Sequence, residues 1–168
     1  MSGIVDVLTC FGIDRSGGAE RRLEDLLAVL ERHGVERALT LSLRAVHYAG
    51  PEGNDETYAV CARHEVLEPV GVVDPRRYFD CFDEIDRRVD QGFRVFRFFP
   101  DIQGWSVEGA NFLRICEKLA EVGARAMLPA GGAGQPTQIA RAVSTMELPT
   151  LLIGAGYGIM GEVMAVLE

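Results

Sequence analysis

The side chains best suited to chemistry are a carboxylate, an imidazole and a guanidinium in the first hundred residues. Asp6 stands inside an apolar run, His47 in a stretch after a second apolar run, and Arg97 between two phenylalanines at the end of a fourth. A buried carboxylate must be paired, hydrogen-bonded or protonated. Asp6 is therefore either a ligand or base, or a core acid satisfied by a partner such as Arg97. These three residues form the candidate catalytic set.

Arg97 has two interpretations that the sequence leaves open. An arginine that points inward at a strand end can bind a carboxylate through two parallel N–H groups. A buried arginine needs an anionic partner in either case, so a bound ligand and an internal carboxylate (Asp6 or Asp74) are equal alternatives. His47 is a candidate because functional residues often lie in loops, although a polar loop histidine also has structural uses.

Two glycine-rich stretches follow apolar runs and precede helical patterns. Backbone N–H groups at a helix N-terminus can bind an anion. The glycines of the first stretch are Gly131, Gly132 and Gly134. Gly156 lies in the second stretch, 154–158, which lacks the third glycine of a dinucleotide-binding fingerprint at the required spacing. Together with Arg97, the glycines predict a pocket for a small anionic ligand.

Trp105 is a further candidate for ligand binding. It follows the apolar run 93–99 that contains Arg97, and Asp101 lies four positions before it. An aromatic ring and a carboxylate on the same rim can line a pocket. The alternative is a turn at Asp101 and a tryptophan that only packs.

Composition excludes several classes of partner. The formal net charge is −8, and an acidic chain without a basic stripe repels nucleic acid. Apolar runs are too short to span a bilayer, and the N-terminus does not resemble a signal peptide. The four cysteines are scattered without metal-type spacing, so we expect free thiols and a cytoplasmic protein.

Short apolar runs alternate with amphipathic segments along the whole chain. We expect strands at 4–9, 38–43, 66–73, 93–99, 125–128 and 150–153. We expect helices at 20–33, 54–64, 78–90, 106–122, 135–146 and 159–168, with Asn54 and Ser106 as N-cap residues of the second and fourth. This alternation predicts an α/β fold with a parallel sheet. Six βα units over residues 1–168 predict a single domain with a partial TIM-type (β/α) barrel.

A closed barrel of this type has eight strands and about 250 residues. We therefore expect the 168-residue domain to be incomplete at its C-terminal side. An arc of six strands leaves unpaired edges, which invite association with another copy of the chain.

Four stretches resemble the amidohydrolase-related family, which includes hydrolases and decarboxylases of small acids. The stretch 4–12, IVDVLTCFG, resembles the family's first strand, D-x-H-x-H-F-G. The stretch 92–100, GFRVFRFFP, resembles its fourth-strand pattern, G-F-x-G-x-K-L-x-P. The stretches 34–38, GVERA, and 72–76, VVDPR, resemble the entry to the second strand and the end of the third. The resemblance implies a metal-dependent hydrolase or decarboxylase on a barrel.

This chain departs from the family at the metal ligands. Leu8 and Cys10 stand where the first strand supplies two histidines. Pro129 replaces the histidine of the fifth strand, and Ala155 or the glycine before it replaces that of the sixth. Only Asp6 matches. A catalytic divalent metal needs roughly three protein ligands, so we expect neither a bound metal nor another cofactor.

Three hypotheses follow from the sequence. The first is a degenerate barrel that lacks metal-dependent hydrolysis and binds a small anion. The second is a hydrolase or decarboxylase of small organic acids with a non-standard site, or one completed by further C-terminal residues. The third is an assembly protein that pairs through its open sheet edges.

Overall fold

The computed structural model describes residues 3–14, 18–47 and 49–167. Within them, one seven-stranded sheet has the order β2-β1-β3-β4-β5-β6-β7. Its strands are β1 Ile4–Ile13, β2 Glu20–Arg21, β3 Val35–Ser42, β4 Leu67–Gly71, β5 Val95–Arg97, β6 Arg125–Pro129 and β7 Thr150–Ile153. All neighbours pair in parallel except β2, which pairs antiparallel with the end of β1.

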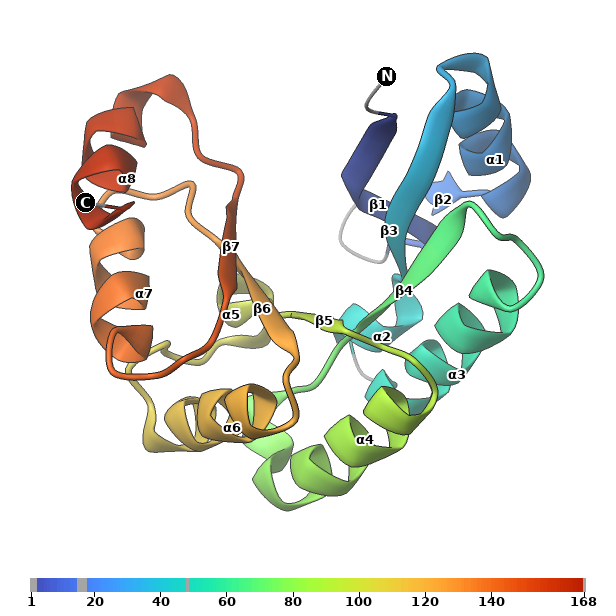
Figure 1. The fold of residues 1–168 in the computed structure, drawn as a ribbon. Helices are drawn as coiled ribbons and strands as arrows, with labels where there is room; N and C mark the ends of the chain where they lie inside the picture. The colour runs from blue at the N-terminus through green and yellow to red at the C-terminus, as the bar shows by residue number, and fades with distance from the viewer. Residues whose placement is uncertain (1–2, 15–17, 48, 168) are drawn as a thin grey trace.

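Helices connect the parallel strands. They are α1 Leu23–Arg32, α2 Arg44–His47, α3 Gly50–Cys61, α4 Tyr78–Asp90, α5 Pro100–Gln103, α6 Ala110–Glu121, α7 Gln135–Val143 and α8 Met160–Leu167, with short 3-10 turns η1 Pro75–Arg77 and η2 Tyr157–Ile159. Figure 1 shows the strands curving as an arc, with the larger helices on its outer side and β1 and β7 at separate ends. The predicted α/β fold and partial barrel are confirmed.

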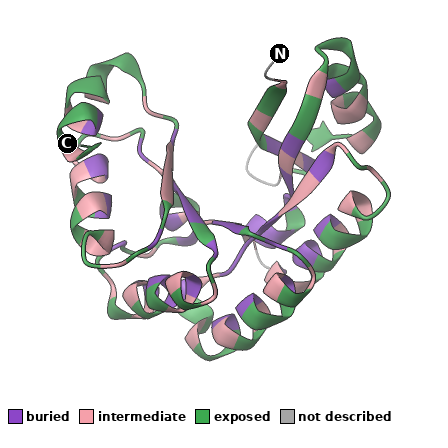
Figure 2. Ribbon diagram, in the orientation of Figure 1, coloured by how far each residue is buried: buried purple, intermediate pink, exposed green. Residues whose placement is uncertain are grey.

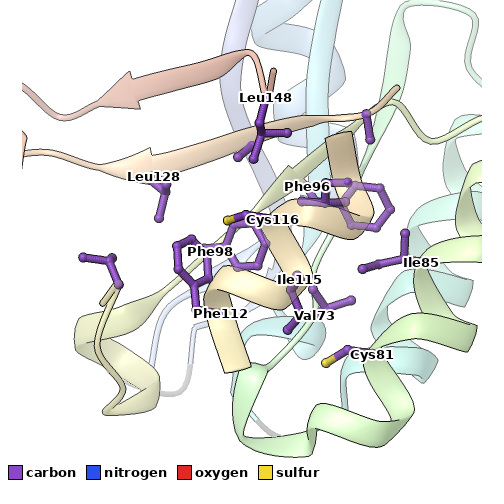
Figure 3. Packing of buried hydrophobic residues seen from close by; sticks show 14 of the residues in the cluster. Val73, Cys81, Ile85, Phe96, Phe98, Phe112, Ile115, Cys116, Leu128 and Leu148 are labelled. Carbon is purple, nitrogen blue, oxygen red and sulfur yellow. The ribbon is translucent and has the colours of Figure 1, made fainter. Parts of the chain in front are cut away.

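The largest core cluster fills the space between the outer face of the sheet and α4, α6 and α7. Phe96, Phe98 and Leu128 point outward from β5 and its neighbours and pack on residues such as Phe112 and Ile115 of α6 (Figure 3). These side chains are fully buried. Because side chains alternate along a strand, this outward packing directs Val95, Arg97 and Met127 to the inner face.

The inner face has its own apolar cluster. Val95, Met127 and Ile153 pack with residues of β3 and α2 and with the partly buried Cys10 and Phe99. Parallel strands end on the same rim of a barrel, and that rim is where barrel sites form. Arg97 and Cys10 therefore lie on the inner face toward that rim.

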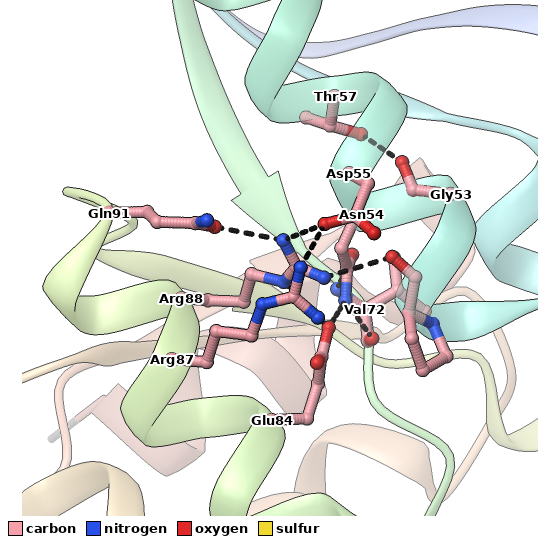
Figure 4. A network of polar contacts seen from close by, with 10 residues as sticks. Gly53, Asn54, Asp55, Thr57, Val72, Glu84, Arg87, Arg88 and Gln91 are labelled. Atoms are coloured by element: carbon pink, nitrogen blue, oxygen red, sulfur yellow. Dashed lines mark hydrogen bonds and ion pairs between the residues drawn. The ribbon is translucent and has the colours of Figure 1, made fainter.

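A buried polar network joins α3 to α4 (Figure 4). The Arg88 side chain is fully buried, and its Nε donates to Glu84 Oε1 at 2.6 Å. Its Nη1 donates to Asp55 Oδ1 at 2.7 Å, and its Nη2 donates to the carbonyl of Pro51. Asn54 Nδ2 also donates to Glu84, at 2.8 Å. These bonds hold the two helices in one position relative to the sheet.

Two predicted helix starts are wrong. Asn54 does not cap α3, because that helix begins at Gly50 and Asn54 is buried within it. Its side-chain amide instead exchanges two hydrogen bonds with the backbone of Val72. Likewise, Ser106 does not cap α6, which begins at Ala110.

Exposed apolar residues gather at one end of the sheet. In β1, Ile4, Val5, Val7 and Leu8 are between 39% and 55% exposed, as the colouring of Figure 2 shows for the outer end of that strand. Along the described part of β1, only the last residues pair with β2. None of the described helices has the length and apolar character needed to cross a lipid bilayer.

Candidate functional site

Arg97 is the last residue of β5 and the centre of the candidate site. Its Nε is buried and has no hydrogen-bond partner among the described residues. The guanidinium lies over the ring of Phe99, 4.7 Å from the ring centroid. Among the described residues, Arg97 forms no ion pair with Asp6 or Asp74, the two internal partners considered from the sequence. Asp74 instead pairs with Arg76 at 2.6 Å.

The surroundings of Arg97 disfavour its charge. Burial lowers the pKa of the Arg97 guanidinium below its ordinary value, because transfer out of water penalises the charged form. Cys10 acts in the opposite direction and favours the protonated guanidinium, whereas the positive charge of Arg21 lowers the pKa further. The site thus holds a desolvated cation beside a second cation.

Arg21 is a site residue that the sequence analysis missed. It lies in β2, within the range 20–33 that was predicted as a helix, and β2 places it beside the end of β1. Its Nη1 donates to Cys10 Sγ at 3.3 Å, and its Nη2 lies 3.8 Å from Asp14 Oδ2. No local pattern in the sequence signals a two-residue strand folded back on β1.

His47 lies near the same rim, at the end of α2 and not in a loop. Its side chain is 16% exposed, and its Nε2 is 3.9 Å from Asp14 Oδ1. It lines a cavity of about 330 Å³ that Gly12, Arg44 and Glu56 also line. Asp14 therefore lies between His47 and Arg21. The imidazole belongs to the edge of the group formed by Arg97, Arg21 and Cys10, which we call the arginine cluster.

Asp6 does not join this cluster. Its Oδ1 accepts a hydrogen bond from the backbone N–H of Leu8 at 3.0 Å. The pairing of β1 with β3 is irregular between Asp6 and Thr9, which is where that local bond forms. The carboxylate is thus satisfied by its own strand, and its role as ligand or base stays a prediction.

The first glycine stretch already holds an anion from the chain itself. The backbone N–H of Gly134 donates to Glu162 Oε2, and that of Thr137 donates to Glu162 Oε1, both at 2.9 Å. The N–H of Gly132 donates to Gln135 Oε1 at 2.8 Å. The Thr137 hydroxyl also donates to Glu162 Oε1. The hydrogen bonds to Glu162 hold its pKa below its usual value, and the one from the Thr137 hydroxyl is the largest cause, followed by those from the backbone N–H groups of Gly134 and Thr137. The carboxylate of Glu162, in α8, therefore caps the N-terminus of α7.

The remaining candidates lie outside the arginine cluster. Gly131 closely approaches the carbonyl of Gly154, and Gly156 is exposed at the start of η2. Trp105 stacks on Phe112 with ring centroids 5.0 Å apart. Trp105 also lines a cavity of about 210 Å³ together with Asp101, and its role in ligand binding stays a prediction.

The residues that the structure describes do not offer a ligand set for a divalent metal. In the parts of the chain that the structure describes, no three His, Cys, Asp or Glu side chains come together as a metal-binding group. Leu8 is 46% exposed on β1 and offers no donor, and Cys10 is engaged by Arg21. Pro129 ends β6. Two cationic guanidiniums at the rim also disfavour a metal cation.

The arc of parallel strands, with its helices outside and the candidate site at the inner rim, has the architecture of a partial TIM barrel. Comparison with known proteins identifies similar folds. No family model and no curated protein matches the chain. An uncharacterised TIM-barrel protein from Bordetella bronchiseptica matches with a TM-score of 0.76 and 15% identity, over 98% of this chain and 71% of that one.

Two enzymes of known name share the same fold. A 5-carboxyvanillate decarboxylase from Sphingomonas paucimobilis has a TM-score of 0.70 and 10% identity, over 97% of this chain and 73% of that one. A probable 2-pyrone-4,6-dicarboxylic acid hydrolase from Acinetobacter baumannii, solved with citric acid, has a TM-score of 0.67 and 12% identity, over 90% and 58%. The barrel fold that the sequence resemblance implies is therefore confirmed.

Proposed function

We propose that this chain is a divergent member of the amidohydrolase-related barrels that binds a small organic anion at the inner rim and lacks metal-dependent hydrolysis. One observation carries the proposal. Arg97 is a desolvated cation on the inner face whose Nε has no hydrogen-bond partner among the described residues. An unpaired buried charge is costly, and a bound carboxylate would offset that cost.

Arg21 strengthens the preference for an anion. Burial is the main cause of the lowered pKa of Arg97, and the positive charge of Arg21 lowers that pKa further. Guanidinium groups bind carboxylates through parallel hydrogen bonds, so a planar carboxylate suits Arg97. The names of two proteins with this fold, a dicarboxylic acid hydrolase and a carboxyvanillate decarboxylase, support a carboxylate as the ligand.

Calorimetric titration with citrate tests the proposal. We expect the native chain to bind citrate and the variant Arg97→Gln to bind about ten- to a hundredfold more weakly, since a hydrogen bond to a charged group contributes about 1.5–3 kcal/mol. Arg125→Gln is the matched control, because Arg125 is exposed and starts β6 at the opposite end of the strands. Equal affinity in both variants would contradict the proposal.

Metal analysis separates this function from the enzymatic alternative. We expect purified protein, dialysed and measured by mass spectrometry for metals, to hold no stoichiometric divalent ion. Bound zinc or manganese at one ion per chain, lost in Cys10→Ala, would instead favour a hydrolase or decarboxylase with a non-standard ligand set.

Self-association is a second candidate, and the exposed apolar face of β1 favours it. Ile4 and Val5 are at least half exposed on a strand whose outer edge is mostly unpaired among the described residues. Such an edge can pair with a second copy of the chain. Light scattering after size-exclusion chromatography tests this candidate.

A further inference from the structure

We propose that Cys10 is a nucleophilic thiol within the anion site and that it reacts preferentially with electrophiles that carry a carboxylate. The inference rests on the proposed anion-binding function and adds a covalent chemistry to it. The chemical class of ligand is a small acid with an electrophilic carbon next to its carboxylate.

Two guanidinium groups lie close to the Cys10 sulfur. Its Sγ accepts a hydrogen bond from Arg21 Nη1 at 3.3 Å, and its charge interacts with Arg97. The thiolate is the reactive form of cysteine, and neighbouring arginines stabilise it. Cys10 is also partly exposed, so a reagent can reach it. Asp14 lies on the other side of Arg21 and offsets part of that positive charge.

Arg97 gives this cluster a feature that a cysteine alone would not have. Among the described residues, its buried Nε has no hydrogen-bond partner. A carboxylate that approaches Arg97 would therefore be brought next to the Cys10 sulfur. The two guanidinium groups that lie near the Cys10 sulfur would thus also attract an electrophile that carries a carboxylate.

The other three cysteines have thiols whose charged form is disfavoured by burial. Burial raises the pKa of Cys61, Cys81 and Cys116 to about 12. Cys81 and Cys116 belong to the apolar core, and Cys81 donates to the carbonyl of Asp74. These thiols stay protonated at neutral pH and serve as internal controls.

Iodoacetate illustrates the reaction. The Cys10 thiol loses its proton to water, and the thiolate attacks the carbon that bears iodine. The carbon–sulfur bond forms as the carbon–iodine bond breaks, and iodide leaves with the electron pair. The product is a carboxymethyl thioether whose carboxylate lies beside the guanidiniums.

Competitive alkylation of the native chain tests the inference. Iodoacetate and iodoacetamide differ in charge, and the labelling rate at each cysteine is followed by peptide mass spectrometry at neutral pH. We expect Cys10 to be labelled first. Its iodoacetate-to-iodoacetamide rate ratio should exceed that of free glutathione by about tenfold, as expected for electrostatic attraction of an anionic reagent. Arg21→Gln and Arg97→Gln should each lower the ratio, and Arg125→Gln should leave it unchanged.

The outcomes separate this inference from the function on which it rests. Slow labelling of Cys10, at the rate of the buried cysteines, would overturn the inference while citrate binding stands. Rapid labelling with the rate ratio of glutathione would overturn the carboxylate preference. If citrate binding is absent as well, the proposed function fails together with it. Circular dichroism of each variant establishes that it is folded.

Discussion

Truncation of Arg88 should destabilise the chain far more than truncation of its neighbour Arg87. Arg88 is fully buried and donates to Glu84, whose side chain is only 10% exposed. In Arg88→Met, Glu84 keeps only the hydrogen bond from Asn54. Removal of one partner of a buried ion pair costs about 3–5 kcal/mol, and we expect the lower part of that range because Asn54 remains.

Arg87→Met is the matched control. Arg87 also donates to Asp55 at 2.6 Å, but both side chains are about half exposed. An exposed pair contributes about 0–1 kcal/mol. Urea unfolding followed by circular dichroism gives both free energies of unfolding. Equal losses in the two variants would refute the argument from burial. The double variant Arg88→Met with Glu84→Leu should regain part of the loss, because it leaves no unpaired carboxylate.

Three further predictions concern the core, the α7 cap and the sheet edge. Phe112→Ala should lower the free energy of unfolding, measured by urea unfolding, by about 3–5 kcal/mol, because this fully buried ring packs on two aromatic neighbours. A loss under about 1 kcal/mol would contradict that packing. The pKa of Glu162 in the folded chain lies below its usual 4.5, so its hydrogen bonds stabilise the fold above pH 4.5, and this stabilisation is lost as the pH falls through the folded-state pKa. The difference in free energy of unfolding between the native chain and Glu162→Ala should therefore shrink on acidification, and a constant difference would exclude this cap. Val7→Lys should shift any dimer seen by light scattering to monomer, because a charge on the apolar edge of β1 opposes pairing, and an unchanged mass would exclude that edge.

The alternation of strands and helices could be predicted from the sequence, because the spacing of apolar residues and the positions of turn residues agree along the chain. The helix at 78–90 and the strand at 150–153 were predicted with the boundaries that the structure has. Asn54 misled the prediction, because an N-cap residue type is here used within a helix to bind the backbone of Val72. Local preference does not encode such a tertiary contact.

The site was only partly readable for the same reason. Arg97 was identified because a charged residue interrupts an apolar strand. Arg21 was not identified, because only the pairing of β2 with β1 brings it to Cys10. The glycine stretch was interpreted as open to a ligand, but Glu162, 28 positions after Gly134, accepts the N–H of Gly134, and Gln135 accepts that of Gly132. Contacts between distant segments decide which groups stay free for a ligand.

The most direct test of the central claim is a crystal structure of the chain grown or soaked with citrate. We predict a citrate carboxylate on the inner face, with its oxygens within about 3 Å of the Arg97 guanidinium. A structure in which Arg97 pairs with an internal carboxylate such as Asp6 or Asp14, with citrate absent from the rim, would contradict it.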